Sequence, residues 1–255
     1  MSVSNLYLVV LIWLAAMTGA IAQPNPIATF DAALAAQTKE NNAAKSIALY
    51  QELVQSEQLS PEVFNNLGLA YLSNNQLGKA IVSFERALWL QPNHADAQYN
   101  LQAAQQRIVS PIAATESAFF VRWWNAAIGV FSSTSWAIIF LLLFAIAIGA
   151  LGTGHWLQKP IFRAVAIGVL LVSIFPFVFG WQQRAILFDQ TKAIIIKKEV
   201  GLRQNPQLVS PEMELIHEGI AVRILEEKNT WTKVQLPNYL VGWIPSKMIV
   251  RVKKL

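Results

Sequence analysis

The sequence predicts a multidomain α + β membrane protein, and three patterns along the chain support this prediction. Within residues 23–110, a pattern of residue types repeats every 34 positions, which is typical of stacked helical hairpins. Two long apolar runs lie within residues 134–184, and short β-branched runs alternate with turn residues over 188–255. This order predicts an α-hairpin repeat domain, a two-helix transmembrane hairpin and a small all-β barrel.

The N-terminal segment, residues 1–22, has the pattern of a secretory signal peptide. It contains no charged side chain, its apolar core runs from Leu6 to Ala16, and residues 20–22 form a small-x-small cleavage site. The basic residues that usually precede the apolar core are absent, so an uncleaved membrane anchor is the alternative. Both interpretations place the following region outside the cytoplasm.

The region between Pro61 and Pro92 has the spacing of a tetratricopeptide (TPR) repeat. Large side chains alternate with small ones that let two helices cross closely; these residues are Phe64, Leu67, Gly68, Tyr71, Ala80, Phe84 and Ala87. Pro92 ends the second helix. TPR units bind proteins or peptides, so this feature indicates an adaptor rather than an enzyme. An unrelated pair of helical hairpins is the alternative.

A second copy of the repeat lies upstream of the first. Residues 44–54 match residues 78–88 at a shift of 34 positions, with aromatic, aliphatic and basic side chains in register. Residues 95–109 continue the pattern without its glycine, as expected of a single amphipathic capping helix. Residues 23–110 are therefore predicted to form a TPR domain of two repeats and a capping helix.

A partner-binding groove is predicted on the first helices of these repeats. The positions that usually face the groove of TPR domains hold Glu62, Asn65, Leu69 and Leu72 in the second repeat. Two further amides, Asn66 and its counterpart Asn100 in the capping helix, are expected to hold a peptide backbone. This mixture predicts a partner segment of mixed polarity. The alternative is that Leu69 and Leu72 only pack on the capping helix.

Residues 111–133 form an aromatic segment between the repeats and the apolar runs. The stretch from Phe119 to Phe131 contains one arginine and no acidic residue. This composition predicts a helix that lies in a membrane interface. A helical extension packed on the TPR cap is the alternative.

The two apolar runs, Trp136–Gly152 and Ile161–Trp181, predict a transmembrane hairpin within residues 134–184, because only a short polar turn joins them. Tryptophans at the ends of the runs are expected at the membrane interfaces. An even number of spans after an export signal places both flanking domains on the same, outer side. The predicted location is the inner (cytoplasmic) membrane, with both soluble domains in the periplasm.

Short β-branched runs at even spacing predict a small antiparallel barrel over residues 188–255, with a hairpin tip at Glu226–Asn229. The stretch HEGIAVRILEEKNTWTKVQLPNYLVGWIPSKMI resembles the bacterial SH3 family. That resemblance implies an aromatic-lined ligand groove, for which Trp231, Tyr239 and Trp243 are the candidates. The alternative is that both tryptophans belong to the barrel core and the tyrosine is only a loop aromatic.

Composition and motifs argue against several classes of chemistry. The chain has no cysteine, so disulfides, thiolate nucleophiles and cysteine metal sites are excluded. None of His94, His155 and His217 has a carboxylate or a second histidine at ligand spacing. Phosphate-binding loops, nucleophile elbows and paired catalytic carboxylates are not found. We therefore expect no catalytic residue, no metal, no cofactor and, in an exported chain, no nucleic-acid partner.

The order of segments resembles the BatE-type members of the Bat aerotolerance family, most clearly in VFNNLGLAYLSNNQLGKAIVSFERALWLQPNHADAQYNL and LIHEGIAVRILEEKNTWTKVQLPNYLVGWIP. The resemblance implies a non-enzymatic inner-membrane scaffold in an envelope complex related to stress or aerotolerance. It also implies partner proteins with von Willebrand A domains. A peptidoglycan-binding sensor or regulator of cell-wall enzymes is the alternative function.

Overall fold

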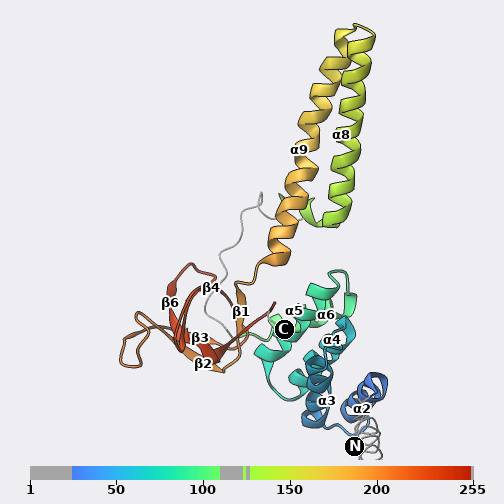
Figure 1. Ribbon diagram of the computed structural model, residues 1–255. Coiled ribbons are helices and arrows are strands. Elements are labelled where there is room, and N and C mark those ends of the chain that lie inside the picture. The colour runs from blue at the N-terminus through green and yellow to red at the C-terminus, as the bar shows by residue number, and fades with distance from the viewer. Residues whose placement is uncertain (1–24, 110–122, 125–126, 254–255) are drawn as a thin grey trace, which may run out of the picture. The chain divides into compact units, whose positions relative to one another are not determined.

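The structure, a computed structural model, describes residues 25–109, 123–124 and 127–253. The predicted signal peptide lies outside this part of the chain. The chain divides into two compact units, which meet in sequence after Arg107. Figure 1 shows the helices of the first unit, and the helical hairpin and β-sheet of the second.

The described part of the first unit consists of two helix pairs that follow the repeat and one further helix. They are α2 (Pro26–Thr38), α3 (Ala43–Gln55), α4 (Pro61–Ser73), α5 (Leu77–Leu90) and α6 (Ala95–Gln105). Most of these helices are preceded by a residue whose side chain accepts a hydrogen bond from a backbone N–H of the first turn; these residues are Asn25, Asn42, Ser60 and His94. Asn41 and Asn75 both adopt the left-handed conformation, with φ of 49° and 54°. The 34-residue repeat therefore includes the loop that joins the two helices of each pair.

The core of the helical unit lies between the paired helices. Tyr50, Phe64, Ile81 and Phe84 are fully buried there. A Cβ atom on Gly68 would lie less than 3.0 Å from carbons of the Phe84 ring. The structure thus confirms that the glycine stands where α4 and α5 cross closely, as the spacing predicts.

Helices α8 (Ser133–Trp156) and α9 (Pro160–Phe188) pack against each other as a hairpin (Figure 1). Both are long and apolar enough to cross a membrane, judged by length and composition. Most of their side chains are exposed, whereas a core helix of a soluble protein is mostly buried. The turn between them is shorter than the sequence predicts, because α8 continues to Trp156 and Gln158 takes a φ of 53°.

The aromatic segment before α8 folds onto this hairpin. The Trp124 indole donates to Oε1 of Gln182 at 2.8 Å, and the Trp136 indole donates to the Ile128 carbonyl at 3.0 Å. The rings of Trp124 and Trp136 both meet the Phe179 ring edge to face, with centroids 5.0 Å apart. The described part of the predicted interfacial segment therefore packs on the hairpin itself, and its other residues lie outside the described part of the chain.

The C-terminal residues form an antiparallel sheet with the strand order β3-β2-β6-β5-β4-β1-β7. The strands are β1 (Lys192–Ile195), β2 (Glu199–Arg203), β3 (Glu212–His217), β4 (Ala221–Lys228), β5 (Trp231–Gln235), β6 (Val241–Pro245) and β7 (Ile249–Arg251), with a 3₁₀ turn η1 (Ser246–Met248) before β7. The sequence pattern does not predict β3. Only Ile216 of this strand is fully buried, so the strand lacks the alternating core residues on which the prediction depends. The helices and this sheet confirm the α + β class.

The hairpin between β4 and β5 is tighter than predicted. Lys228 pairs with Trp231, so only Asn229 and Thr230 form the turn. Asn229 has a φ of 53°, which two-residue hairpin turns require and asparagine tolerates. The predicted tip residue Glu226 lies within the ladder, because β4 continues past the irregularity in register between Ile224 and Glu226.

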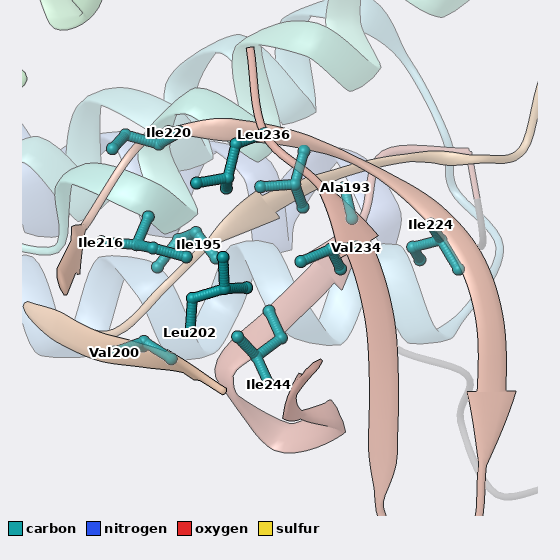
Figure 2. Packing of buried hydrophobic residues seen from close by; sticks show 11 residues of the cluster. Ala193, Ile195, Val200, Leu202, Ile216, Ile220, Ile224, Val234, Leu236 and Ile244 are labelled. Atoms are coloured by element: carbon teal, nitrogen blue, oxygen red, sulfur yellow. The ribbon is translucent and has the colours of Figure 1, made fainter. Parts of the chain in front are cut away.

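One hydrophobic core lies on the concave side of this curved sheet (Figure 2). Its buried members are Ala193, Ile195, Val200, Leu202, Ile216, Ile220, Val222, Ile224, Val234, Leu236 and Ile244. Strands from both ends of the sheet order contribute to the same cluster, so the sheet wraps around it. Because side chains alternate along a strand, the intervening residues of β4 and β5 lie on the opposite face.

Candidate functional site

The first helices of the repeats lie next to one another, and α4 contacts both α2 and α6. Matching positions in these three helices therefore form rows across one surface, as in other stacked repeats. We refer to this surface of α2, α4 and α6 as the groove. Of the six residues that the sequence predicts for partner binding through the repeats, five belong to α4 and Asn100 belongs to α6.

The predicted residues of α4 differ in their exposure. Glu62 is exposed, Leu69 and Leu72 are half-buried, and Asn65 is only 7% exposed. The two leucines remain partly accessible although α6 packs on α4. Glu62 and the leucines are therefore available to a partner, whereas Asn65 is largely enclosed by the protein.

The three predicted asparagines do not lie together. Nδ2 of Asn100 donates to Oδ1 of Asn65 at 2.9 Å, which ties α6 to α4. Asn66 lies beside Tyr50 of α3 instead. Burial raises the pKa of the Tyr50 hydroxyl to about 12, and the Asn66 amide opposes that shift. The Tyr50 hydroxyl has no partner among the described residues at hydrogen-bond distance and angle. Asn65, not Asn66, is therefore the neighbour of Asn100.

Tyr99 is a groove residue that the sequence reasoning does not single out. It lies on α6 one repeat period after Asn65, and its side chain is 74% exposed. Asp31 occupies the same position in α2 and is also exposed. The 34-residue shift alone could have identified both residues. An exposed aromatic ring beside polar groups is a frequent anchor for a protein partner.

A layer of aromatic and cationic side chains supports the groove from behind. Nε2 of Gln51 donates to the Tyr71 hydroxyl at 2.7 Å, and the Lys79 ammonium lies 5.5 Å from the Tyr71 ring centre. The Arg86 guanidinium lies 5.9 Å from the Phe64 ring centre. Burial lowers the pKa of Arg86, and Tyr71 partly opposes that shift. These contacts join α3, α4 and α5, so they hold α4, the central helix of the groove, against its neighbours.

The predicted aromatic residues of the C-terminal sheet lie in two places. Trp231 and Trp243 stand on the face opposite the core cluster, since the residues next to them in β5 and β6 point into that cluster. Trp243 is nevertheless 8% exposed, with the Lys233 ammonium 5.8 Å from its ring centre. Tyr239 lies beyond the other end of β5 from Trp231. The structure thus places the two tryptophans on the same face of neighbouring strands and the tyrosine beyond the other end of β5.

The histidines and acids of the described residues form no metal site. No group of three or more such side chains is close enough to hold a metal ion in that part of the chain. Nδ1 of His94 accepts a hydrogen bond from the Ala97 amide at 3.2 Å, so this histidine caps α6. Its role in the described structure is structural.

One family model matches the chain. The tetratricopeptide repeat model matches residues 61–94, which cover α4, α5 and the loop before α6. No curated protein matches the sequence. The chain therefore contains a TPR repeat at the place where the residue spacing predicts one, and this repeat carries the central helix of the groove.

Proposed function

We propose that this protein is a non-enzymatic scaffold of the inner membrane that binds a protein partner through the groove. The observation that supports this most is the TPR repeat at residues 61–94, with Glu62, Leu69 and Tyr99 accessible on neighbouring helices. TPR repeats are interaction modules, and the layer behind α4 keeps this surface preformed. A preformed surface loses little conformational entropy on binding.

The hairpin of α8 and α9 would anchor the scaffold in the membrane. Its apolar side chains are exposed along both helices, including Leu141 and Leu171. In water such a surface would be a large contiguous apolar patch, which soluble monomers rarely present. In a bilayer the same surface is compatible with its surroundings. The export signal that the sequence predicts would then place the repeats and the C-terminal sheet in the periplasm.

The C-terminal sheet would act as a second docking module, similar in role to a bacterial SH3 domain. The resemblance to the Bat aerotolerance family implies partner proteins with von Willebrand A domains, and a segment of such a protein would occupy the groove. In this proposal the groove and the sheet together hold parts of an envelope complex that is related to stress or aerotolerance.

Site-specific photocrosslinking tests the groove. A benzophenone amino acid would replace Leu69 or Tyr99 in the groove, Glu52 on the exposed side of α3, or Leu141 on α8. After irradiation of intact cells, we expect a protein adduct from the first two positions and none from Glu52. Mass spectrometry would then identify the partner. Adducts from Leu141 without any from Leu69 or Tyr99 would show that the hairpin carries the assembly instead.

A further inference from the structure

A cavity of about 420 Å³ in the C-terminal sheet is lined by residues in or next to β1, β4 and β5, and neither tryptophan lines it. Its volume is within the range of sites that bind small ligands. The lining residues include Asp189, Thr191, Lys192, Arg223, Gln235 and Tyr239. Three of these can carry charge at neutral pH, and they come from segments that are distant in the sequence.

Three polar residues that line the cavity lie side by side on neighbouring strands. Arg223 of β4 pairs directly with Lys192 of β1 on one side and with Gln235 of β5 on the other. All three lie on the face opposite the core cluster. Arg223 is exposed and lines the cavity, so its guanidinium can pair with an anionic group there.

Asp189 adds a fixed carboxylate to the rim of the cavity. Oδ1 of Asp189 accepts hydrogen bonds from the Thr191 amide at 2.8 Å and from the Thr191 hydroxyl at 2.6 Å. The Thr191 hydroxyl lowers the pKa of Asp189 most, Arg223 and Lys253 lower it further, and burial opposes them. The carboxylate is therefore ionised and reduces the net positive charge of the cavity.

Tyr239 stands at the rim in a strained backbone conformation. Its φ is 67°, in the left-handed region that favours glycine or asparagine, and its side chain is 70% exposed. Three bonds hold this turn: Leu236 N to Leu240 O at 2.8 Å, Tyr239 N to Leu236 O at 2.9 Å, and Leu240 N to Asn238 Oδ1 at 3.1 Å. Such strain is typically kept at functional sites.

We propose that this cavity binds the free α-carboxylate of a peptide. The Arg223 guanidinium receives the carboxylate with its two parallel N–H donors, a geometry that suits carboxylates. The Tyr239 ring covers the apolar part of the preceding residue, and the Asp189 carboxylate accepts its amide N–H. This inference deepens the proposed docking role of the C-terminal sheet and does not depend on the groove.

Binding of labelled dipeptides to the full-length protein in detergent tests the proposal. The probe is fluorescein-labelled Ala-Phe with a free carboxylate, compared with its C-terminal amide by fluorescence anisotropy. We expect the acid to bind about tenfold or more tightly than the amide, since charge-assisted bonds to Arg223 are lost in the amide. Equal binding of acid and amide would overturn the proposal. L,L and D,D forms of the probe distinguish a protein C-terminus from a cell-wall peptide as the source.

Three variants assign the binding to this cavity. Arg223→Gln should weaken binding of the acid about tenfold, whereas Lys228→Gln removes the same charge from the same strand outside the cavity and should change nothing. Tyr239→Asn relieves the strained turn, so it should lower affinity while the Tm stays equal or rises. Unchanged binding in Arg223→Gln would refute the site. Photocrosslinking at Leu69 should persist in Arg223→Gln, so failure of the cavity and failure of the groove are distinguishable.

Discussion

Two buried residues of the repeats, Gly68 and Ser46, differ in how a substitution would change the stability of the helical unit. Gly68 faces the Phe84 ring with no room for a Cβ atom. Ser46 occupies the position that Ala80 holds one repeat later, and its hydroxyl is fully buried without a hydrogen-bond partner among the described residues. The first position has no room for a side chain, and the second has a buried hydroxyl that water would stabilise better.

We predict that Gly68→Leu unfolds the repeats. Overpacking of a core costs about 1–3 kcal/mol, and a Leu side chain at this crossing would have to displace the Phe84 ring. A two-repeat array has few neighbouring repeats to compensate for such a loss. The measurement is thermal unfolding of a fragment of residues 23–110 by circular dichroism. Ala32→Leu, at an exposed position of α2, is the matched control and should melt near the wild-type temperature.

We predict that Ser46→Ala stabilises the same fragment. Removing a buried, unpaired hydroxyl recovers a desolvation cost of about 1 kcal/mol, and alanine already fits this position of the second repeat. The Tm should therefore rise. Ser83→Ala is the comparison, because the Ser83 hydroxyl donates to the Lys79 carbonyl at 2.9 Å and its loss should not stabilise. A Tm for Ser46→Ala at or below wild type would contradict this prediction.

At the scale of elements, the hairpin of α8 and α9 is held by close approach at its open end. A Cβ atom on Gly180 would lie 3.3 Å from Cβ of Trp136 and 3.6 Å from the Ser133 carbonyl. Trp136 also contacts Phe179 and the Ile128 carbonyl, so the end of α8, the end of α9 and the preceding segment meet there. In a bilayer, small residues at such contacts let helices associate through packing alone.

We predict that Gly180→Leu separates α9 from α8, because the added side chain would collide with Trp136. Gly168→Leu is the matched control, since a Cβ atom at Gly168 has no neighbour within 4 Å. Both variants would be purified in detergent and compared by thermal unfolding and by protease resistance of the hairpin. We expect a lower Tm and faster cleavage for Gly180→Leu only. Equal loss in both variants would mean that chain hydrophobicity, not packing, controls the hairpin.

At the scale of the whole molecule, the number of spans decides on which side the two soluble parts lie. The structure has a helical unit before α8 and a sheet after α9, joined by two helices that can cross a membrane. Two crossings return the chain to its starting side. The repeats and the sheet would therefore face the same compartment, where both can bind parts of one complex.

We predict that this compartment is the periplasm. Cysteine can be introduced into the cysteine-free chain by Gln58→Cys before α4, Gln158→Cys in the turn of the hairpin, or Asn238→Cys in the turn after β5. All three positions are exposed. An impermeant maleimide should label the first and third variants in intact spheroplasts, and Gln158→Cys only after lysis. Labelling of the Gln158→Cys variant alone would reverse the topology.

The sequence by itself determined which elements form, because helical and strand periodicity, caps and turn residues are local properties. The 34-residue spacing located the TPR repeat and the need for Gly68, and the apolar runs located α8 and α9. Strand β3 was missed, because half of its side chains are polar and a single isoleucine is fully buried in the core.

Only the tertiary structure decided which side chains meet. It pairs Asn65 with Asn100 and leaves Asn66 beside Tyr50, because helix rotation and stacking set those contacts. Strand order brings Lys192 and Arg223 together although more than one strand separates them in the sequence. Contacts between distant residues depend on how whole elements pack, and packing free energy is shared among many side chains at once. No local pattern in the chain encodes it.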